Sequence, residues 1–322
     1  MQAILAVTVP FFALVLAGWL AAERRLLPDE AIPGLNAFVL YFALPCMLFR
    51  FGSSTPVAQL LDPVVLVVYT ASALLIVFVV VSLSLNARVG LKDAAFGALV
   101  AAFPNTGFMG IPLLVALLGP SAAGPLTSVL LADLFVTSSL CIALAQSEGA
   151  AAAGRRRALG RALKGAMSNP LPWSIAAGAM VGVIGLKLPG PVDTIVQMLA
   201  SAATPVALFT IGAVLSRAGR AAHGKTPYRD FVPVAAVKLL LHPLLVGVLA
   251  LSALRMGAPL TVSQITVMVL AAALPSASNV SLLAERFGAD NGRIARIIMT
   301  STALAFVTFT ATAWLLGARP VG

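Results

Sequence analysis

The sequence predicts an all-α integral membrane protein with ten transmembrane helices, arranged as two inverted five-helix repeats. Three observations lead to this fold class. The composition is 60% hydrophobic and only 10% charged, apolar runs long enough to span a bilayer recur along the chain, and similar proline-containing segments occur in its two halves. So apolar a composition excludes both an ordinary soluble domain and an intrinsically disordered chain.

A helix needs about 20 apolar residues to cross the hydrocarbon core of a bilayer. Ten runs of about that length cover residues 2–22, 33–51, 63–85, 94–118, 124–146, 171–187, 191–216, 229–254, 262–287 and 292–317. The first run has no basic leader and no convincing cleavage site, so we expect it to be a retained span rather than a signal peptide. The connections are short, and we expect no sizeable soluble domain.

The two halves of the chain follow one plan. Ala43–Phe49 in the second run resembles Ala203–Phe209 in the seventh, and Ala101–Pro104 in the fourth run resembles Ala272–Pro275 in the ninth. We therefore divide the chain into a first five-span repeat over residues 1–146, a basic cytoplasmic loop over 147–170 and a second repeat over 171–322. Because five is an odd number, the second repeat starts on the opposite side of the membrane and the repeats are inverted.

Prolines interrupt the fourth and ninth runs in matching positions. The fourth contains Pro-Asn-Thr-Gly-Phe-Met-Gly-Ile-Pro from Pro104 to Pro112, and the ninth contains Leu-Pro-Ser-Ala-Ser-Asn around Pro275. Proline removes a backbone donor and clashes with the preceding turn. In hydrocarbon such breaks persist only where protein or a wet cavity surrounds them, and paired breaks indicate a transporter binding site near the membrane midplane. The alternative is that the prolines only kink two helices.

The net charge of +10 has a simple explanation in the membrane topology. Of the 21 basic residues, 16 fall on one side of the predicted membrane, many of them in the loop at 147–170. Lysine and arginine excess marks cytoplasmic loops, so both termini are predicted to face outward and no nucleic-acid partner is needed. Cys46 and Cys141 lie in apolar runs without metal-ligand spacing, and we expect core packing rather than a metal site.

Three segments resemble the auxin efflux carrier family, which includes the plant PIN-formed carriers and many bacterial relatives. They are Gly34–Phe38 leading into Leu44 and Pro45, the Pro104–Pro112 run, and Pro275–Asn279 followed by Ala284–Gly288. The resemblance covers essentially the whole chain. It implies a bacterial inner-membrane protein whose scaffold and crossover domains interleave in the sequence, with spans 4 and 9 as broken crossover helices.

The same resemblance implies transport of an organic anion by an elevator-type movement. Bacterial members are associated with malonate, malate and related carboxylates, and the plant members with indole-3-acetate. The chain lacks the long cytoplasmic loop of many plant members, so their regulation by phosphorylation of that loop does not carry over.

Asn105 and Thr106 stand at the break in the fourth run. The Asn105 amide and the Thr106 hydroxyl would donate hydrogen bonds to a substrate carboxylate, together with backbone N–H groups freed at the helix ends. Alternatively, both side chains cap the half-helices. Gly107 belongs to the same candidate site, where it more readily permits close approach of the crossing chains.

Ser276, Ser278 and Asn279 are the counterparts in the ninth run. Asn279 is the preferred ligand contact, and the pseudo-symmetry would place it opposite Asn105. The two serines have a structural alternative, because serine hydroxyls often bond back to the helix carbonyl four residues earlier.

Three ionisable residues within the runs are candidates for proton or ion coupling. Asp133 lies in the fifth run, where a carboxylate is costly unless it is paired or wet; it would carry a proton, bind a cation or form a structural ion pair. Lys238 and His242 share one helix face. Lys238 would pair with Asp133, lie near the anion or extend to the membrane surface, and His242 would act as a proton switch or pack in the core.

These observations favour a secondary carrier for a small organic anion. The alternative is a sodium- or proton-coupled cation antiporter of similar architecture, which would need acidic residues at the crossing, where only Asp133 is available. No nucleophile–base set or phosphate loop appears, so we predict no enzymatic activity. The expected partners are the anion, a coupled proton or sodium ion, membrane lipids and a second copy in a homodimer; we expect no cofactor.

Overall fold

A computed structural model describes the chain except residues 87, 148–159, 161–163, 165–166, 222–225 and 319–322. The described residues form helices joined by short connections, with one isolated β-bridge and no strand among them. The all-α fold class is confirmed. Most of the predicted basic loop at 147–170 lies outside the described residues.

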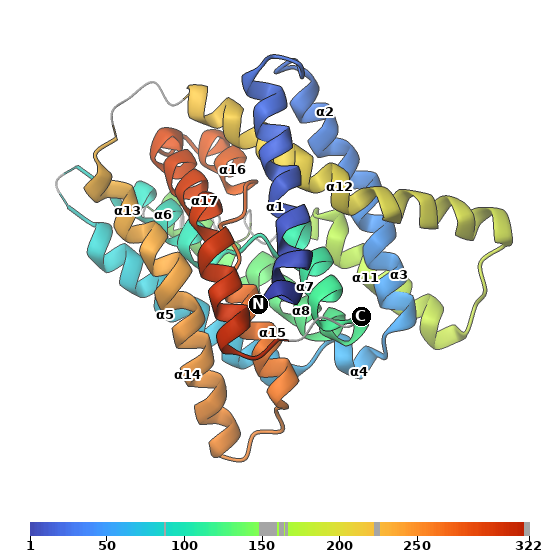
Figure 1. Cartoon of the computed structure of the whole chain (residues 1–322). Coiled ribbons are helices and arrows are strands. Elements are labelled where there is room, and N and C mark those ends of the chain that lie inside the picture. Colours follow the sequence, from blue (N-terminus) through green and yellow to red (C-terminus); the bar gives the residue numbers. More distant parts are fainter. Residues whose placement is uncertain (87, 148–159, 161–163, 165–166, 222–225, 319–322) are drawn as a thin grey trace.

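The helices follow one another closely along the chain (Figure 1). In the first half they are α1 (Gln2–Glu23), α2 (Ala31–Phe38), α3 (Leu44–Ser54), α4 (Val57–Leu60), α5 (Pro63–Ser84), α6 (Leu91–Ala102), α7 (Ile111–Leu118), α8 (Ala123–Leu131) and α9 (Ser138–Gln146). In the second half they are α11 (Pro170–Ile184), α12 (Gly190–Ala221), α13 (Tyr228–Ala236), α14 (His242–Arg255), α15 (Val262–Ala273), α16 (Val280–Arg286) and α17 (Asn291–Leu315). Shorter turns are η1 (Val39–Ala43), η2 (Thr106–Gly110), η3 (Pro120–Ala122), η4 (Ala132–Thr137) and η5 (Val237–Leu241).

Seven helical segments among the described residues are long and apolar enough to cross a membrane. They are Gln2–Glu23, Ala31–Ser54, Val57–Ser84, Pro120–Gln146, Gly190–Arg220, Tyr228–Arg255 and Asn291–Leu315. Three shorter apolar helices are Thr106–Leu118, Pro170–Ile184 and Val262–Ala273. The first and third each cover about half of the predicted fourth and ninth runs, and the second covers most of the predicted sixth run. This pattern is that of a multi-pass membrane protein.

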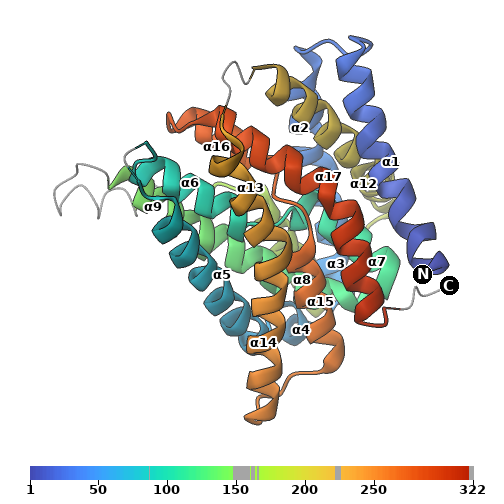
Figure 2. The ribbon, with the colours of Figure 1, turned by 60° about the vertical axis from the view of Figure 1, so that its left-hand side comes forward.

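The helices gather in two groups. In the first group, α1 packs along α12 and α3 packs along α11, while α12 also contacts α2 and α3. In the second, α5 packs on α6 and α14, α14 on α15, α6 on α9 and α13 on α17. Figure 2 shows α1, α2 and α12 on one side and α5, α6 and α14 on the other. The two groups meet where α17 and η2 contact α12.

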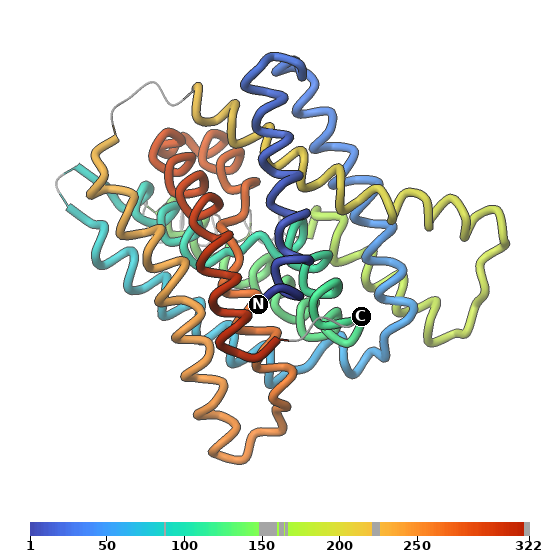
Figure 3. Tube along the Cα trace, viewed as in Figure 1, coloured from blue at the N-terminus to red at the C-terminus, as the bar shows by residue number. Residues whose placement is uncertain are grey.

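Prolines explain three π-helical turns. Pro45, Pro112 and Pro243 each lie two residues after the end of such a turn, at η1, η2 and η5. Proline clashes with the carbonyl four residues before it, and widening the preceding turn by one residue relieves that clash. Each helix therefore bends or bulges without ending (the Cα trace in Figure 3 shows the path).

Side chains at the helix starts fix several of the connections. The Asp62 carboxylate accepts hydrogen bonds from Val64 and Val65 N–H at the start of α5, and Thr261 forms a capping box with Gln264 at the start of α15. Gln264 also donates to Asp62 at 2.7 Å. The starts of α5 and α15 are thereby held together across 202 residues of sequence.

Glycine allows the closest helix contact in the first group. A Cβ atom added at Gly212 of α12 would lie 1.9 Å from Val15 O, and one added at Gly18 of α1 would lie 1.9 Å from Phe209 O. The two backbones therefore touch directly. Small residues at helix crossings are a common device for association inside membranes, where hydrophobicity does not drive helices together.

Gly212→Ala is expected to destabilise the protein, because α1 and α12 must separate to admit the methyl group. Overpacking of this kind costs about 1–3 kcal/mol, which would appear as a lower midpoint of thermal unfolding in detergent. The matched control is Gly190→Ala at the start of the same helix, where no atom lies within 4 Å of the added Cβ. Equal midpoints for the two variants would contradict direct backbone packing.

Candidate functional site

Two non-helical segments cross in the interior of the protein. Helix α6 ends at Ala102 and η2 begins at Thr106, while α15 ends at Ala273 and α16 begins at Val280. Pro104 and Ser276 form an antiparallel bridge between the two segments. Asn105 N–H donates to Pro275 O at 2.9 Å, and Ala277 N–H donates to Phe103 O at 3.1 Å. The crossing is thus a short two-stranded contact between chain segments about 170 residues apart.

Pro104 and Pro275 explain where the helices end. Neither can donate a backbone hydrogen bond, and the residue before a proline favours extended backbone. The preceding residues, Phe103 and Leu274, are extended at ψ 95° and 155°. Pro112 lies elsewhere, as the second residue of α7 beyond the wide turn η2.

The crossing satisfies several of its own backbone donors. Besides the two inter-segment bonds, Thr106 N–H donates to Pro104 O at 2.8 Å and Ser276 N–H donates to Ser301 Oγ at 3.2 Å. The N–H groups of Gly107 and Phe108, in the first turn after the break, have no acceptor in the described part of the chain. They are the donors left for a ligand on this side of the crossing.

Unpartnered polar side chains line up along both segments. Thr106 and Ser276 are each 1% exposed, and neither hydroxyl has a hydrogen-bond partner among the described residues. Asn105 is also buried. Leaving a buried polar group unpaired costs about 1–3 kcal/mol, so such groups in a folded protein call for an explanation. A polar ligand between the segments would supply one.

The alternative in which Asn105 and Thr106 cap the half-helices does not match the geometry, since the Thr106 hydroxyl has no partner among the described residues and Asn105 makes no capping bond. Asn105 occupies the position before η2 and Asn279 the position before α16, yet neither side chain makes a capping hydrogen bond. Asn279 is half-buried and Ser278 is buried. At Gly107 an added Cβ would meet only Leu171 and Leu130, at 3.6 and 3.7 Å, which is ordinary contact, so space alone does not demand glycine there.

Asp133, Lys238 and His242 come together beside the crossing, and all three are fully buried. Lys238 Nζ donates to Ala272 O at 2.8 Å and lies 3.3 Å from His242 Nδ1. Thr137 Oγ1 donates to Asp133 Oδ1 at 3.4 Å, and Asp133 provides the opposite charge for Lys238. Burial excludes the alternative in which Lys238 extends to the membrane surface.

Lys238 connects this cluster to the crossing. Ala272 is the second-last residue of α15, so its carbonyl is one of the acceptors that a helix leaves unpaired at its end. The ammonium group neutralises the negative end of the α15 dipole where the chain turns into the crossing. Asp133 and Lys238 both lie in π-helical turns, η4 and η5, and such turns are frequent at functional sites.

Tyr69 completes the cluster, and sequence reasoning missed it. Its ring lies 5.8 Å from that of His242 between centroids, its side chain is fully buried, and it interacts electrostatically with Asp133. The Tyr69 hydroxyl, Asp133 Oδ2 and His242 Nε2 have no hydrogen-bond partner within the described residues. A tyrosine within the apolar 63–85 run was the available signal, because buried tyrosines usually need a partner for the hydroxyl.

A many-helix membrane protein in which two buried, non-helical segments cross has features of a membrane transporter. Comparison with known families agrees. The model of the membrane transport protein family matches residues 3–314, so the chain belongs to this family, that of the auxin efflux carriers which its motifs resemble.

Relatives of similar length support the same assignment. The chain is 30% identical to a putative malonate transporter of Rhizobium meliloti over 99% of this chain and 98% of that protein. It is 26% identical to the uncharacterized transporter YfdV of Escherichia coli K12, over 97% and 96%. An uncharacterized transporter of Methanothermobacter thermautotrophicus is 24% identical over 92% of each chain. These names are those of transporters, not of enzymes.

Proposed function

We propose that this protein is a secondary carrier for a small organic anion, either a dicarboxylate of the malonate or malate type or another small carboxylate. The observation that carries the proposal is the pair of buried hydroxyls at the crossing, Thr106 and Ser276, which have no partner among the described residues and lie near the buried Asn105 amide. An ionised carboxylate can accept hydrogen bonds but cannot donate them. Hydrogen bonds to an ionised acceptor are stronger than those between neutral groups. The name of the Rhizobium relative points to the same substrate class.

In this proposal each group at the crossing has a role. The amide of Asn105 and the hydroxyls of Thr106 and Ser276 would hold the carboxylates, with Ser278 and Asn279 completing the far segment. The free N–H groups of Gly107 and Phe108 add the positive end of the η2–α7 helix dipole. Neutral donors are suited to a carrier, because they bind an anion less tightly than a full counter-charge would and so allow its release.

Ten spans in two inverted repeats remain our proposal for the membrane topology, with both termini outward in the bacterial inner membrane. In an inverted repeat of this kind, spans 1 and 2 correspond to spans 6 and 7. A contact between spans 1 and 7 is then matched by a contact between spans 6 and 2. The two closest pairs of the first helix group, α1 with α12 and α3 with α11, are these pairs. The antiparallel crossing of spans 4 and 9 supports the same symmetry.

The two helix groups suggest how the site would move. We assign the group of α1–α3, α11 and α12 to the scaffold and the group that holds the crossing to the mobile crossover domain. Transport by an elevator-type movement would slide the second group along the first. Asp133, Lys238, His242 and Tyr69 all lie in the mobile group, so a proton or sodium ion bound there would travel with the substrate and couple the two movements.

Thr106→Val and Ser276→Ala test the binding role against a structural one. Because neither hydroxyl has a hydrogen-bond partner in the described part of the chain, we expect both variants to keep or raise the midpoint of thermal unfolding. Each is expected to raise the half-saturating concentration of malonate in proteoliposome counterflow by about tenfold, the effect of losing one hydrogen bond to a charged group. A lower unfolding midpoint with unchanged half-saturation would show that the hydroxyls serve the fold.

The same assay addresses the antiporter alternative. Counterflow would be run with sodium and with indole-3-acetate as competitors beside unlabelled malonate and malate. Inhibition by the dicarboxylates alone agrees with the proposal. Sodium flux that proceeds without any organic anion and disappears in Asp133→Asn would favour a cation antiporter instead.

A further inference from the structure

A large cavity with a mixed polar and apolar lining lies beside the first helix group, away from the crossing. Its volume is about 820 Å³. On one side it is lined by α3, α11, the 185–188 connection and the start of α12; on the other it is lined by the 55–59 segment with α4 and by Pro120 and Ser121 of η3. The crossing residues do not line it. By the charge distribution, this is the outward face of the protein, opposite the basic loops.

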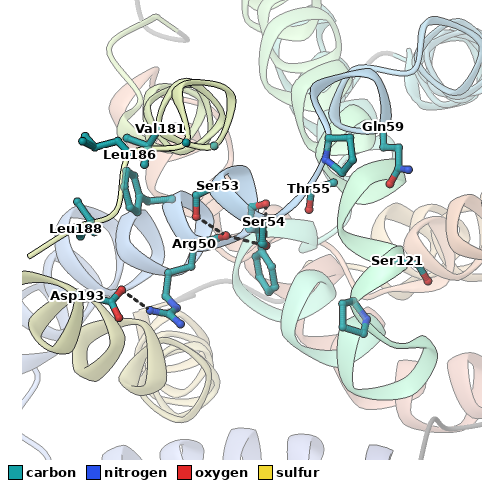
Figure 4. Close-up of a pocket in the computed structure, with 16 residues that line it drawn as sticks. Arg50, Ser53, Ser54, Thr55, Gln59, Ser121, Val181, Leu186, Leu188 and Asp193 are labelled. Atoms are coloured by element: carbon teal, nitrogen blue, oxygen red, sulfur yellow. Dashed lines mark hydrogen bonds and ion pairs between the residues drawn. The ribbon is translucent and has the colours of Figure 1, made fainter. Parts of the chain in front are cut away.

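Arg50 is the charged group that defines this cavity. It projects from α3 toward Asp193 at the start of α12 (Figure 4), and Arg50 Nη1 lies 3.0 Å from Asp193 Oδ1. The guanidinium has five N–H donors in a planar fork that matches a carboxylate. Asp193 uses one of these donors, and the side chain of Arg50 remains 41% exposed.

The other polar side chains on α3 are already occupied. The Ser53 hydroxyl donates to Arg50 O at 3.0 Å, and the Ser54 hydroxyl donates to Arg50 O at 2.9 Å. These bonds hold the last turn of α3 and leave the guanidinium as its free recognition group. The Arg50–Asp193 pair joins α3 to α12 within the scaffold group, whereas the opposite wall comes from α4 and η3, outside that group.

We propose that this cavity is the outer vestibule of the carrier and that Arg50 is the residue that captures the incoming carboxylate. The inference rests on the proposed function and adds a second anion contact to it. An anion that enters would exchange with Asp193 for the guanidinium, so Asp193 holds Arg50 in position and competes with the substrate. A partly exposed charge acts mainly on capture and is screened by salt.

Counterflow of labelled malonate across proteoliposomes tests this role. Arg50→Gln is expected to raise the half-saturating external concentration about fivefold while the maximal rate stays within about twofold, since the crossing is intact. Asp193→Asn is expected to lower that concentration, because it removes the competitor. The matched control is Arg255→Gln, an exposed basic residue expected on the same face but outside the cavity lining. Unchanged half-saturation in Arg50→Gln and Asp193→Asn would overturn the proposal.

A second measurement is independent of the transported substrate. Ser121→Cys, in a background with Cys46→Ser and Cys141→Ser, places one thiol on the cavity wall. We expect an anionic thiol reagent to react faster than a neutral one, with the preference lost in Arg50→Gln and malonate slowing the reaction. A preference independent of Arg50, or an Arg50 effect seen only in vesicles of anionic lipid, would overturn the role in substrate capture. If wild type shows this charge preference but no malonate counterflow, the proposed substrate fails and the vestibule stands.

Discussion

Replacing Asn105 with alanine is expected to weaken malonate transport by about ten- to a hundredfold. The amide is buried at the crossing, makes no capping bond and stands beside the unpartnered Thr106 hydroxyl. Loss of a hydrogen bond to a charged ligand costs about 1.5–3 kcal/mol, which corresponds to that range of affinity. The measurement is the initial rate of counterflow at a malonate concentration below half-saturation.

The control for this variant is Gln197→Ala, which truncates an exposed amide on α12. It is expected to transport like wild type. Both variants should elute as single species from size exclusion, because Asn105 uses only its backbone in holding the two segments together. Wild-type transport by a folded Asn105→Ala protein would remove the crossing from the binding site.

Lys238→Ala is expected to cause the largest loss of stability among single substitutions in the cluster. Lys238 is fully buried, bonds to Ala272 O and carries the charge opposite to Asp133. Removing the ammonium group leaves the buried Ala272 carbonyl without its donor, which costs about 1–3 kcal/mol, and it takes the neighbouring positive charge away from Asp133. The midpoint of thermal unfolding in detergent reports this loss.

A double substitution separates the charge from the packing. Lys238→Met keeps most of the side-chain volume, and adding Asp133→Asn removes the charge that Lys238→Met leaves alone. The double variant is therefore expected to be more stable than Lys238→Met, with a favourable coupling energy in the cycle. Additive effects of the two substitutions would show that Asp133 and Lys238 do not interact in the folded protein.

Proline was the most reliable guide in the sequence. Pro104 and Pro275 mark the ends of α6 and α15, because the constraint that proline places on its own and the preceding residue is local. The buried ionisable residues were equally visible, since Asp133, Lys238 and His242 stand out in apolar runs. Such signals depend on the residues themselves and their neighbours in sequence, so they can be recognised without the tertiary structure.

What the sequence left open depends on contacts between distant segments. The sequence predicted that backbone N–H groups at the breaks bind the ligand, but protein atoms accept three of them. Pro275 O and Phe103 O accept hydrogen bonds from two of these N–H groups. The hydroxyl oxygen of Ser301 accepts from the third, Ser276 N–H. Tyr69 joins the charged cluster only once α5 packs against α14. These pairings are set by docking of helices, which leaves no trace in local spacing.

The membrane-spanning segments were likewise predicted only in part. The long runs form uninterrupted or bulged helices, but the fourth and ninth runs each divide at a proline, and the sixth forms the 15-residue helix α11. Hydrophobic length alone therefore identifies seven segments among the described residues, with three shorter helices beside them. A count of apolar runs in the sequence includes both the long and the shorter helices, because a few polar residues barely change the average hydrophobicity of a run.

Equilibrium binding of labelled malonate to the purified protein shows whether the crossing binds a dicarboxylate, and it requires no assumption about the direction of transport or its coupling. Wild type would be compared with the double variant Thr106→Val and Ser276→Ala, both in detergent and both checked for a cooperative unfolding transition. If the crossing binds the substrate, wild type shows saturable binding that malate displaces, and the double variant binds at least about tenfold more weakly. Equal binding by the two proteins, or no saturable binding of either dicarboxylate by folded wild type, would contradict binding at the crossing.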